Sequence, residues 1–87
     1  MTTPPHTLNP DLVFKRLGER MVLIRLSTNQ VFEFNSTGAR IWELLEAGAH
    51  EDEILERLTA EFEVGPDQSR QDLDNLLQYL KTEGLVS

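Results

Sequence analysis

The stretch QVFEFNSTGARIW, residues 30 to 42, contains two kinds of structure joined without a gap. In its first half the residues alternate, so that Phe32 and Phe34 share one side of the backbone, as in a strand with one buried face. From Ser36 the alternation stops and apolar residues recur at helical spacing. The stretch therefore predicts a short strand that runs directly into a helix.

Two further strands are expected before it, at residues 12–17 and 20–27. Gly18-Glu19 separates these two and suits a type II′ hairpin turn, because glycine tolerates a positive φ at the first loop position. Thr28-Asn29 separates the second strand from the third, at residues 30–35. Since short loops make consecutive strands antiparallel neighbours, we expect a three-stranded meander in which the third strand is an edge.

Three helices are expected after this sheet. Ser36 is the predicted N-cap of the first, which ends at Gly48 in the left-handed conformation. The second begins near His50, a poor capping residue, and the third runs from Pro66 to Gly84. Their apolar stripes consist of Ile41, Leu44, Leu45, Ile54, Leu55, Leu58, Phe62, Leu73, Leu76 and Leu80, with Trp42 and Leu77 at the margins. The predicted fold is α+β, similar to a winged helix-turn-helix: a three-stranded antiparallel meander followed by three helices.

Composition narrows the classes of function. The chain has 87 residues, a formal net charge of −7 and no cysteine. The acidic balance argues against nucleic acid as a partner, since binding phosphates requires Lys and Arg. His6 and His50 have no neighbours at metal-ligand spacing, so we predict no metal, no cofactor and no catalytic residue. Without a long apolar run we predict no membrane contact and a cytoplasmic location.

The first eleven residues differ from the rest. Residues 1–11 hold three of the four prolines and no periodic apolar pattern, so we expect an extended or disordered arm. Residues 12–87 are expected to form one domain.

Over roughly residues 12–86, nearly the whole chain, the sequence resembles the family of the D protein of pyrroloquinoline quinone synthesis. The same fold is known as the RiPP recognition element, which binds leader peptides of ribosomally made, modified peptides. The resemblance rests on an ordered set of features: the strand ending in Asn35, Ser36-Thr37-Gly38-Ala39, Ile41-Trp42, Leu44-Leu45, Gly48, Ile54 with Leu58, Phe62-x-Val64-x-Pro66, Asp72 and Gly84-Leu85-Val86. The STGARIWELL segment is more similar to the stand-alone recognition proteins of lasso-peptide clusters than to the quinone-pathway branch.

The resemblance implies a non-catalytic adaptor. A leader peptide, anchored by a Tyr and a Pro of its own, would add as a fourth, antiparallel strand beside the third strand and under the third helix. The implied partners are that leader region, a leader peptidase and a cyclase.

The residues of the third strand permit such an addition. The strand carries one charge, Glu33, and no proline or lysine to protect its edge. The predicted contacts on this strand are Val31, Phe32, Glu33 and Phe34. A strand too short to need protection, or one covered by the N-terminal arm, is the open alternative.

The third helix would form the facing wall. On a helical wheel one flank carries Asp67, Arg70, Asp74 and Lys81 beside Leu77, and the other carries Asp72, Tyr79 and Glu83. The hand of packing decides which flank faces the strand. We predict the first flank, and the predicted contacts on this helix are Asp67, Arg70, Leu73, Asp74 and Leu77.

Three alternative functions remain open at the level of sequence. The first is a peptide chaperone of pyrroloquinoline quinone synthesis. The second is a winged-helix DNA-binding regulator, although the third helix offers only Arg70 and Lys81 as cations. The third is an enzyme, for which a chain of this size leaves little room for a catalytic cleft.

Overall fold

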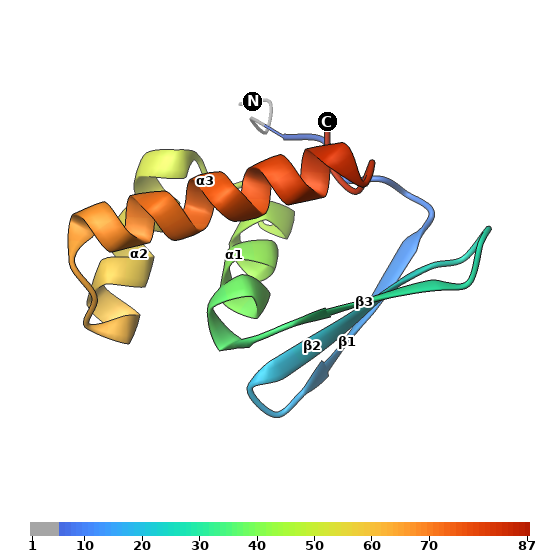
Figure 1. Ribbon diagram of the computed structural model, residues 1–87, viewed down its shortest axis with the longest axis horizontal. Helices are drawn as coiled ribbons and strands as arrows, with labels where there is room; N and C mark the ends of the chain where they lie inside the picture. The colour runs from blue at the N-terminus through green and yellow to red at the C-terminus, as the bar shows by residue number, and fades with distance from the viewer. Residues whose placement is uncertain (1–5) are drawn as a thin grey trace.

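The structure is a computed structural model that describes residues 6–87. Three strands precede three helices along the chain (Figure 1). Their bounds are β1 Leu12–Leu17, β2 Arg20–Arg25, β3 Gln30–Phe34, α1 Ser36–Glu46, α2 Glu51–Phe62 and α3 Pro66–Thr82. The strands form one antiparallel sheet in the order β1-β2-β3. The predicted α+β fold, a meander followed by three helices, is confirmed.

The first hairpin is closed by a two-residue loop. Leu17 lies opposite Arg20 at the end of the β1–β2 ladder, with Gly18 and Glu19 between them. Gly18 has a φ of +64°, and Glu19 is not among the positive-φ residues of the described chain. A positive φ at the first loop position alone is the pattern of the type II′ turn that the sequence predicts.

The second hairpin differs from its prediction, because β2 ends at Arg25 and not at residue 27. The backbone amide of Leu26 donates to the carbonyl of Asp11 at 2.9 Å, and the amide of Ser27 donates to the Asp11 carboxylate at 3.1 Å. The first bond continues the register of β1 with β2, while the ladder between β2 and β3 ends at the pair Arg25 and Gln30. The loop therefore has four residues, and Asn29 takes the positive φ, 58°.

The helix ends show which capping residues act. Asn35, and not the predicted Ser36, is the N-cap of α1, since its side-chain oxygen accepts from the amide of Gly38 at 2.9 Å. His50 precedes α2 without a side-chain cap bond, as expected for an imidazole. Gly48 and Gly84 have φ values of 84° and 74°, which confirms both as left-handed helix ends.

The core lies between one face of the sheet and the three helices. The sheet contributes alternate residues of β2 and β3, as the pleat of a strand requires. Trp42 is 2% exposed and packs in this core. The other large members are Met21, Leu23, Phe32, Phe34, Ile41, Leu44, Leu45, Ile54, Leu58, Leu73, Leu77, Leu80 and Leu85.

The two ends of the described chain pair with each other. Thr7 and Ser87 exchange two backbone hydrogen bonds, of 3.2 and 2.9 Å, and Leu8 bridges to Val86. Of the arm predicted at residues 1–11, residues 1–5 lie outside the described residues. None of the helices in residues 6–87 combines the length and apolar character that crossing a membrane requires.

Candidate functional site

The outer edge of β3 is the first element of the candidate site. β3 pairs on one side with β2, and no segment of residues 6–87 pairs with its other side. Residues 7–9 of the arm lie against the C-terminal segment and not along this edge. Within the described chain, this row of backbone groups is vacant.

The register identifies which backbone groups point outward. A two-residue hairpin is closed by a hydrogen-bonded pair, here Leu17 and Arg20, and bonded pairs then alternate along the ladder. Even-numbered residues of β2 therefore bond to β1, and odd-numbered residues bond to β3. The β3 partners of those odd-numbered residues are Gln30, Phe32 and Phe34. Val31 and Glu33 consequently direct their amides and carbonyls away from the sheet.

The side chains of β3 divide between two faces. Phe32 and Phe34 are 5% and 7% exposed, because their rings enter the core. Val31 is 57% exposed on the opposite face, beside Glu33. A molecule that binds this edge would meet the backbone of Val31 and Glu33 and the rims of the two aromatic rings.

The orientation of α3 corrects the sequence prediction. Leu77 is 6% exposed and belongs to the core, whereas Leu76 is only partly buried. With Leu77 turned inward, α3 is rotated about its axis so that Arg70 points toward α2. There its guanidinium lies 3.5 Å from the Glu51 carboxylate. The prediction that the flank of Asp67, Arg70 and Asp74 faces β3 is therefore wrong. The opposite flank, which carries Tyr79, faces the strand.

Tyr79 and Phe32 form the contact between α3 and β3. Their rings meet edge to face, with centroids 6.4 Å apart and an interplanar angle of 78°. Tyr79 remains 44% exposed, so one side of its ring faces solvent. In the sequence, the signal for this contact was Tyr79, an aromatic residue on the polar side of an amphipathic helix. The helical wheel alone could not show that Tyr79 faces β3.

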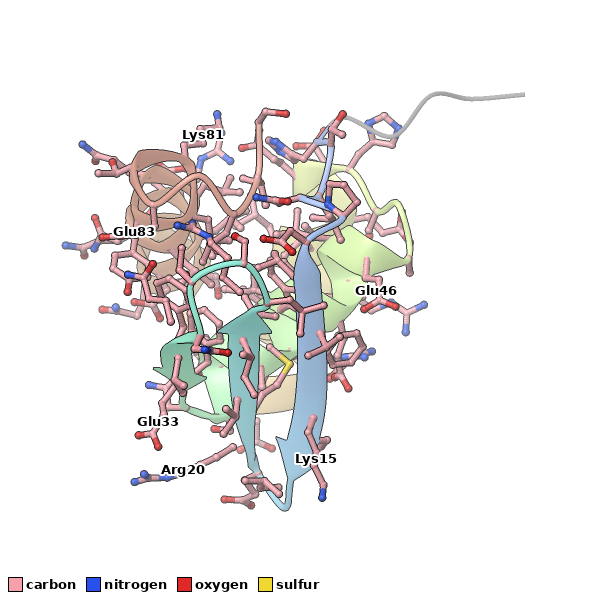
Figure 2. The ribbon with its side chains drawn as sticks, turned by 90° about the vertical axis from the view of Figure 1, so that its right-hand side faces the viewer. Lys15, Arg20, Glu33, Glu46, Lys81 and Glu83 are labelled. Carbon is pink, nitrogen blue, oxygen red and sulfur yellow. The ribbon has the colours of Figure 1, made fainter. Side chains whose placement is uncertain are left out.

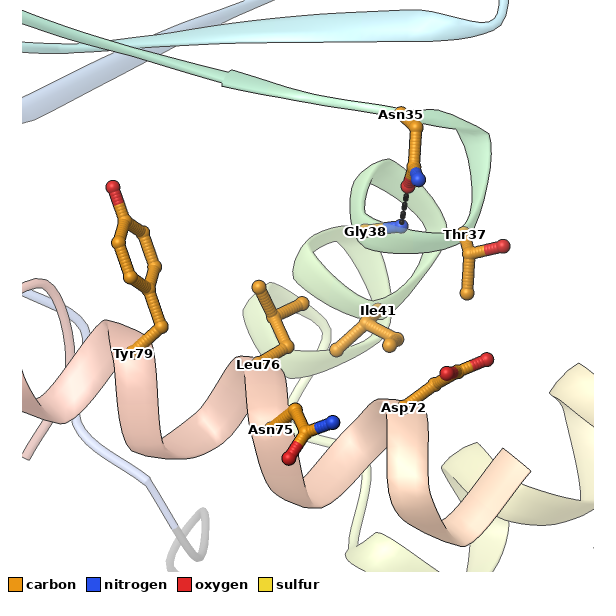
Figure 3. A pocket seen from close by; sticks show the side chains of 8 residues that line it. All are labelled: Asn35, Thr37, Gly38, Ile41, Asp72, Asn75, Leu76 and Tyr79. Atoms are coloured by element: carbon orange, nitrogen blue, oxygen red, sulfur yellow. Dashed lines mark hydrogen bonds between the residues drawn. The ribbon is translucent and has the colours of Figure 1, made fainter. Parts of the chain in front are cut away.

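A hollow opens between α3 and the junction of β3 with α1, with a volume of about 340 Å³. In Figure 3, the side chains of Tyr79, Leu76, Asn75 and Asp72 lie along α3 on one side of the hollow. Its other side is formed by Asn35, Thr37, Gly38 and Ile41. We call the space between the outer edge of β3 and these α3 residues the groove. None of the eight residues that line the hollow was among the contacts predicted from the sequence.

The groove has an apolar floor and polar sides. Ile41 and Leu76 supply the floor, and Asn35, Thr37, Asp72 and Asn75 supply hydroxyl, amide and carboxylate groups. The Asp72 carboxylate accepts from the side chain of Gln68 at 2.8 Å and forms no ion pair with the described residues. Such a lining suits a peptide side chain that is apolar along its length and polar at its end.

An ion pair between α1 and α2 involves Arg40. The pKa of Arg40 is raised, mainly by its hydrogen bond with the Glu61 carboxylate, 2.9 Å from Nε. This pair joins α1 to α2. Residues 6–87 contain no group of three or more His, Cys, Asp or Glu side chains placed to hold a metal ion.

The sheet face opposite the core is not covered by any element of residues 6–87, and its two halves differ. Figure 2 shows Lys15, Arg20 and Glu33 projecting from the end of the sheet near the first hairpin. Toward the second loop, Val13, Ile24 and Val31 lie side by side on all three strands and form one apolar row. Val13 and Val31 are 45% and 57% exposed, and Leu26 in the adjoining loop is 54% exposed. We call this the open face.

Comparison with known proteins gives one family and two similar solved structures. The family Coenzyme PQQ synthesis protein D (PqqD) matches residues 20–86, most of the chain. TbiB1 in complex with the TbiA(beta) leader peptide is 30% identical, with a TM-score of 0.84 over 92% of this chain and 93% of that one. Lasso peptide synthetase B1 complexed with the leader peptide is 26% identical, with a TM-score of 0.85 over 94% and 96%.

A search of curated protein sequences finds no match. The family match extends from the start of β2 to the chain segment that follows α3. The resemblance noted from the sequence is thereby confirmed. The chain belongs to the PqqD family and has the fold of a RiPP recognition element.

Proposed function

We propose that this protein is a non-catalytic adaptor of lasso-peptide biosynthesis that binds the leader region of a precursor peptide. The leader adds as a fourth, antiparallel strand along β3. The observation that carries the proposal is the vacant outer edge of β3 beside the groove. The two similar B1 structures, both solved with a leader peptide, support it.

The backbone of β3 supplies the part of the binding that is independent of sequence. Val31 and Glu33 each offer one amide and one carbonyl, and an added strand satisfies these groups. In an antiparallel addition the first residues of the leader lie near Phe34, and its last bound residues lie near Gln30. The leader then leaves the sheet beside the loop of Leu26.

The groove supplies selectivity. Leader side chains on the inner side of the added strand enter the space between β3 and α3, where they meet Tyr79, Leu76 and Ile41. Their polar ends come within reach of Asp72 and Asn75. Because these residues differ in shape and polarity from one another, a leader must match them position by position.

The proposed contact set retains the strand residues and replaces the helix residues. Val31, Phe32, Glu33 and Phe34 stay in the set. Leu73 and Leu77 are buried in the core, and the flank of Arg70 and Asp74 faces away from the strand. Their places are taken by Asp72, Asn75, Leu76 and Tyr79.

We further propose that a leader peptidase docks on the open face, and that a cyclase receives the same tethered precursor. An added leader strand extends the row of Val13, Ile24 and Val31, so the open face and the bound leader form one continuous surface. That row lies at the end of the sheet where an antiparallel leader exits. Tethering raises the local concentration of the substrate for the enzyme.

The alternative functions fit the structure less well. The quinone-pathway chaperone shares the fold, but of the two similar leader-bound structures one is a lasso peptide synthetase B1 and the other is TbiB1. A DNA-binding role would need a basic face on α3, yet Arg70 is engaged by Glu51 and Asp74.

An adaptor that meets newly translated precursor would act in the cytoplasm.

The direct test is titration of the protein with the leader peptide encoded beside its gene. We expect saturable binding, and a scrambled peptide of the same composition serves as the control. Absence of binding at several hundred micromolar leader would contradict the proposal. A fourth strand in a structure of the complex, located elsewhere than β3, would contradict the mechanism alone.

A further inference from the structure

The side chain of Arg25 bridges the sheet and the last turn of α3. Arg25 is the final residue of β2 and lies opposite Gln30 of β3. One terminal nitrogen donates to the backbone carbonyl of Glu83, the C-cap residue of α3. The other donates to the side-chain oxygen of Gln30 at 3.1 Å. One guanidinium thus joins both walls of the groove.

The backbones of α3 and β3 approach each other closely at few points. The backbone of α3 packs most closely against α2, and the backbone of the sheet packs against α1. The separation between α3 and β3 is therefore set by side chains. The core side chains Leu73, Leu77 and Leu80 fill part of this space. Arg25 and the ring pair of Phe32 with Tyr79 also bridge it.

Arg25 is also connected to that aromatic pair. Its guanidinium carbon lies 5.7 Å from the centroid of the Phe32 ring, within the range of a cation–π interaction. Phe32 in turn meets Tyr79 edge to face. Three side chains in series, Arg25, Phe32 and Tyr79, therefore run from the end of α3 across the base of the groove.

The chemistry at the end of α3 favours arginine. The carbonyls of the last helical turn form the negative pole of the helix, which a cation stabilises. Only a planar guanidinium can donate to two separate acceptors while its face covers a ring. The Nε of Arg25 is buried without an acceptor among the described residues, which is a cost that the other contacts of the guanidinium must offset.

We infer that Arg25 is a positioning residue for leader binding: it fixes the width of the groove through Glu83 and Phe32 without touching the leader. This inference rests on the proposed function. Loss of the guanidinium would remove the bond to Glu83 and the contact with Phe32, which would loosen the last turn of α3 and the ring of Tyr79. The leader would then have to order both on binding, and its affinity would fall.

The test compares Arg25→Met with Arg16→Met by leader titration. Arg16 is a matched control, because its guanidinium also makes two contacts, to the carbonyl of Gly18 at 2.8 Å and to Glu43 at 3.0 Å. The contact with Glu43 joins β1 to α1, the contact with Gly18 lies within the first hairpin, and both are away from the groove. We expect Arg25→Met to weaken leader binding about tenfold, as for loss of one hydrogen bond to a charged group, and Arg16→Met to leave it unchanged.

A conservative variant separates positioning from folding. Arg25→Lys keeps the charge at the end of α3 but can serve one acceptor, so we expect about a threefold loss, between wild type and Arg25→Met. Circular dichroism and urea unfolding establish that each variant is folded at the temperature of titration. If Arg25→Met does not fold, Arg25→Lys carries the test.

The outcomes distinguish this inference from the proposed function. Wild-type protein that fails to bind the leader overturns the proposed function and the inference with it. Wild-type protein that binds, with folded Arg25 variants of equal affinity, overturns the inference alone. Equal losses in the Arg16 and Arg25 variants also overturn it, because the effect would then be general.

Discussion

The ring of Tyr79 stands against the ring of Phe32, 6.4 Å away and nearly perpendicular to it. The two residues are far apart in the sequence and come from different walls of the groove. Phe32 is buried, whereas the outer side of Tyr79 is open to solvent. The pair therefore couples a core position to the surface that a bound peptide would cover.

Tyr79→Ala is expected to weaken leader binding about tenfold, since an aromatic wall contributes contact area that alanine cannot replace. Tyr79→Phe keeps the ring and its contact with Phe32 and should bind within about twofold of wild type. Isothermal titration calorimetry measures both. A Tyr79→Ala protein with wild-type affinity would mean that the leader does not reach this wall.

Val31→Pro is expected to abolish detectable leader binding while the sheet stays intact. The register directs the amide of residue 31 outward, so proline removes a donor to the leader and none to β2. Phe14→Pro is the matched control, because residue 14 directs its amide outward at the opposite edge of the sheet, on β1. Circular dichroism checks folding, and equal losses in the two variants would argue against β3 as the docking edge.

Two adjacent residues of α3 test which flank forms the groove. Asn75 lines the hollow, and Asp74 lies on the flank that faces away from the strand. Asn75→Trp should fill the hollow and weaken leader binding about tenfold or more, whereas Asp74→Trp should change it less than about twofold. Fluorescence anisotropy of a labelled leader gives both values. The reverse order would restore the flank predicted from the sequence.

Val13→Lys tests the open face. Val13 is exposed on β1, at the far end of the apolar row from β3, so leader affinity should be unchanged. The partner peptidase, however, would meet a charge in an apolar interface, and we expect the rate of leader cleavage to fall about tenfold. Lys15→Ala, two residues along the same strand, is the control. Cleavage at the wild-type rate by the Val13 variant would place the peptidase elsewhere.

Asn35→Ala should lower the free energy of unfolding by about 1 kcal/mol, because it removes the side-chain cap of α1. Ser36→Ala should lower it far less, since the Ser36 hydroxyl does not cap the helix. Urea denaturation followed by the fluorescence of Trp42 measures both. The opposite ranking would return the capping role to Ser36.

Local chemistry allowed most of the fold to be predicted. Gly18, Gly48 and Gly84 adopt the positive φ values expected of them, and alternation in β3 separated buried Phe32 from exposed Val31. The errors were one or two residues long and had tertiary causes. Leu26 and Ser27 bond to Asp11 on the β1 side and do not pair with β3, and no local pattern reveals that partner.

The candidate site was predicted in part. The vacant edge followed from strand order, which short loops determine. The flank of α3 did not, because Leu76 and Leu77 are equally apolar and a small rotation about the helix axis exchanges their places. Only the packing of α3 on α2, with Arg70 beside Glu51, decides that rotation.

The short row of outward groups on β3 limits what strand addition can contribute. Val31 and Glu33 offer four backbone hydrogen bonds, and at about 1 kcal/mol each these give about 4 kcal/mol. Such an energy corresponds to a dissociation constant of about 1 mM. A featureless peptide would therefore dissociate almost as soon as it paired. Retention long enough for an enzyme to act must come from side chains held under α3, so leader sequence, and not strand formation, decides which precursors are processed.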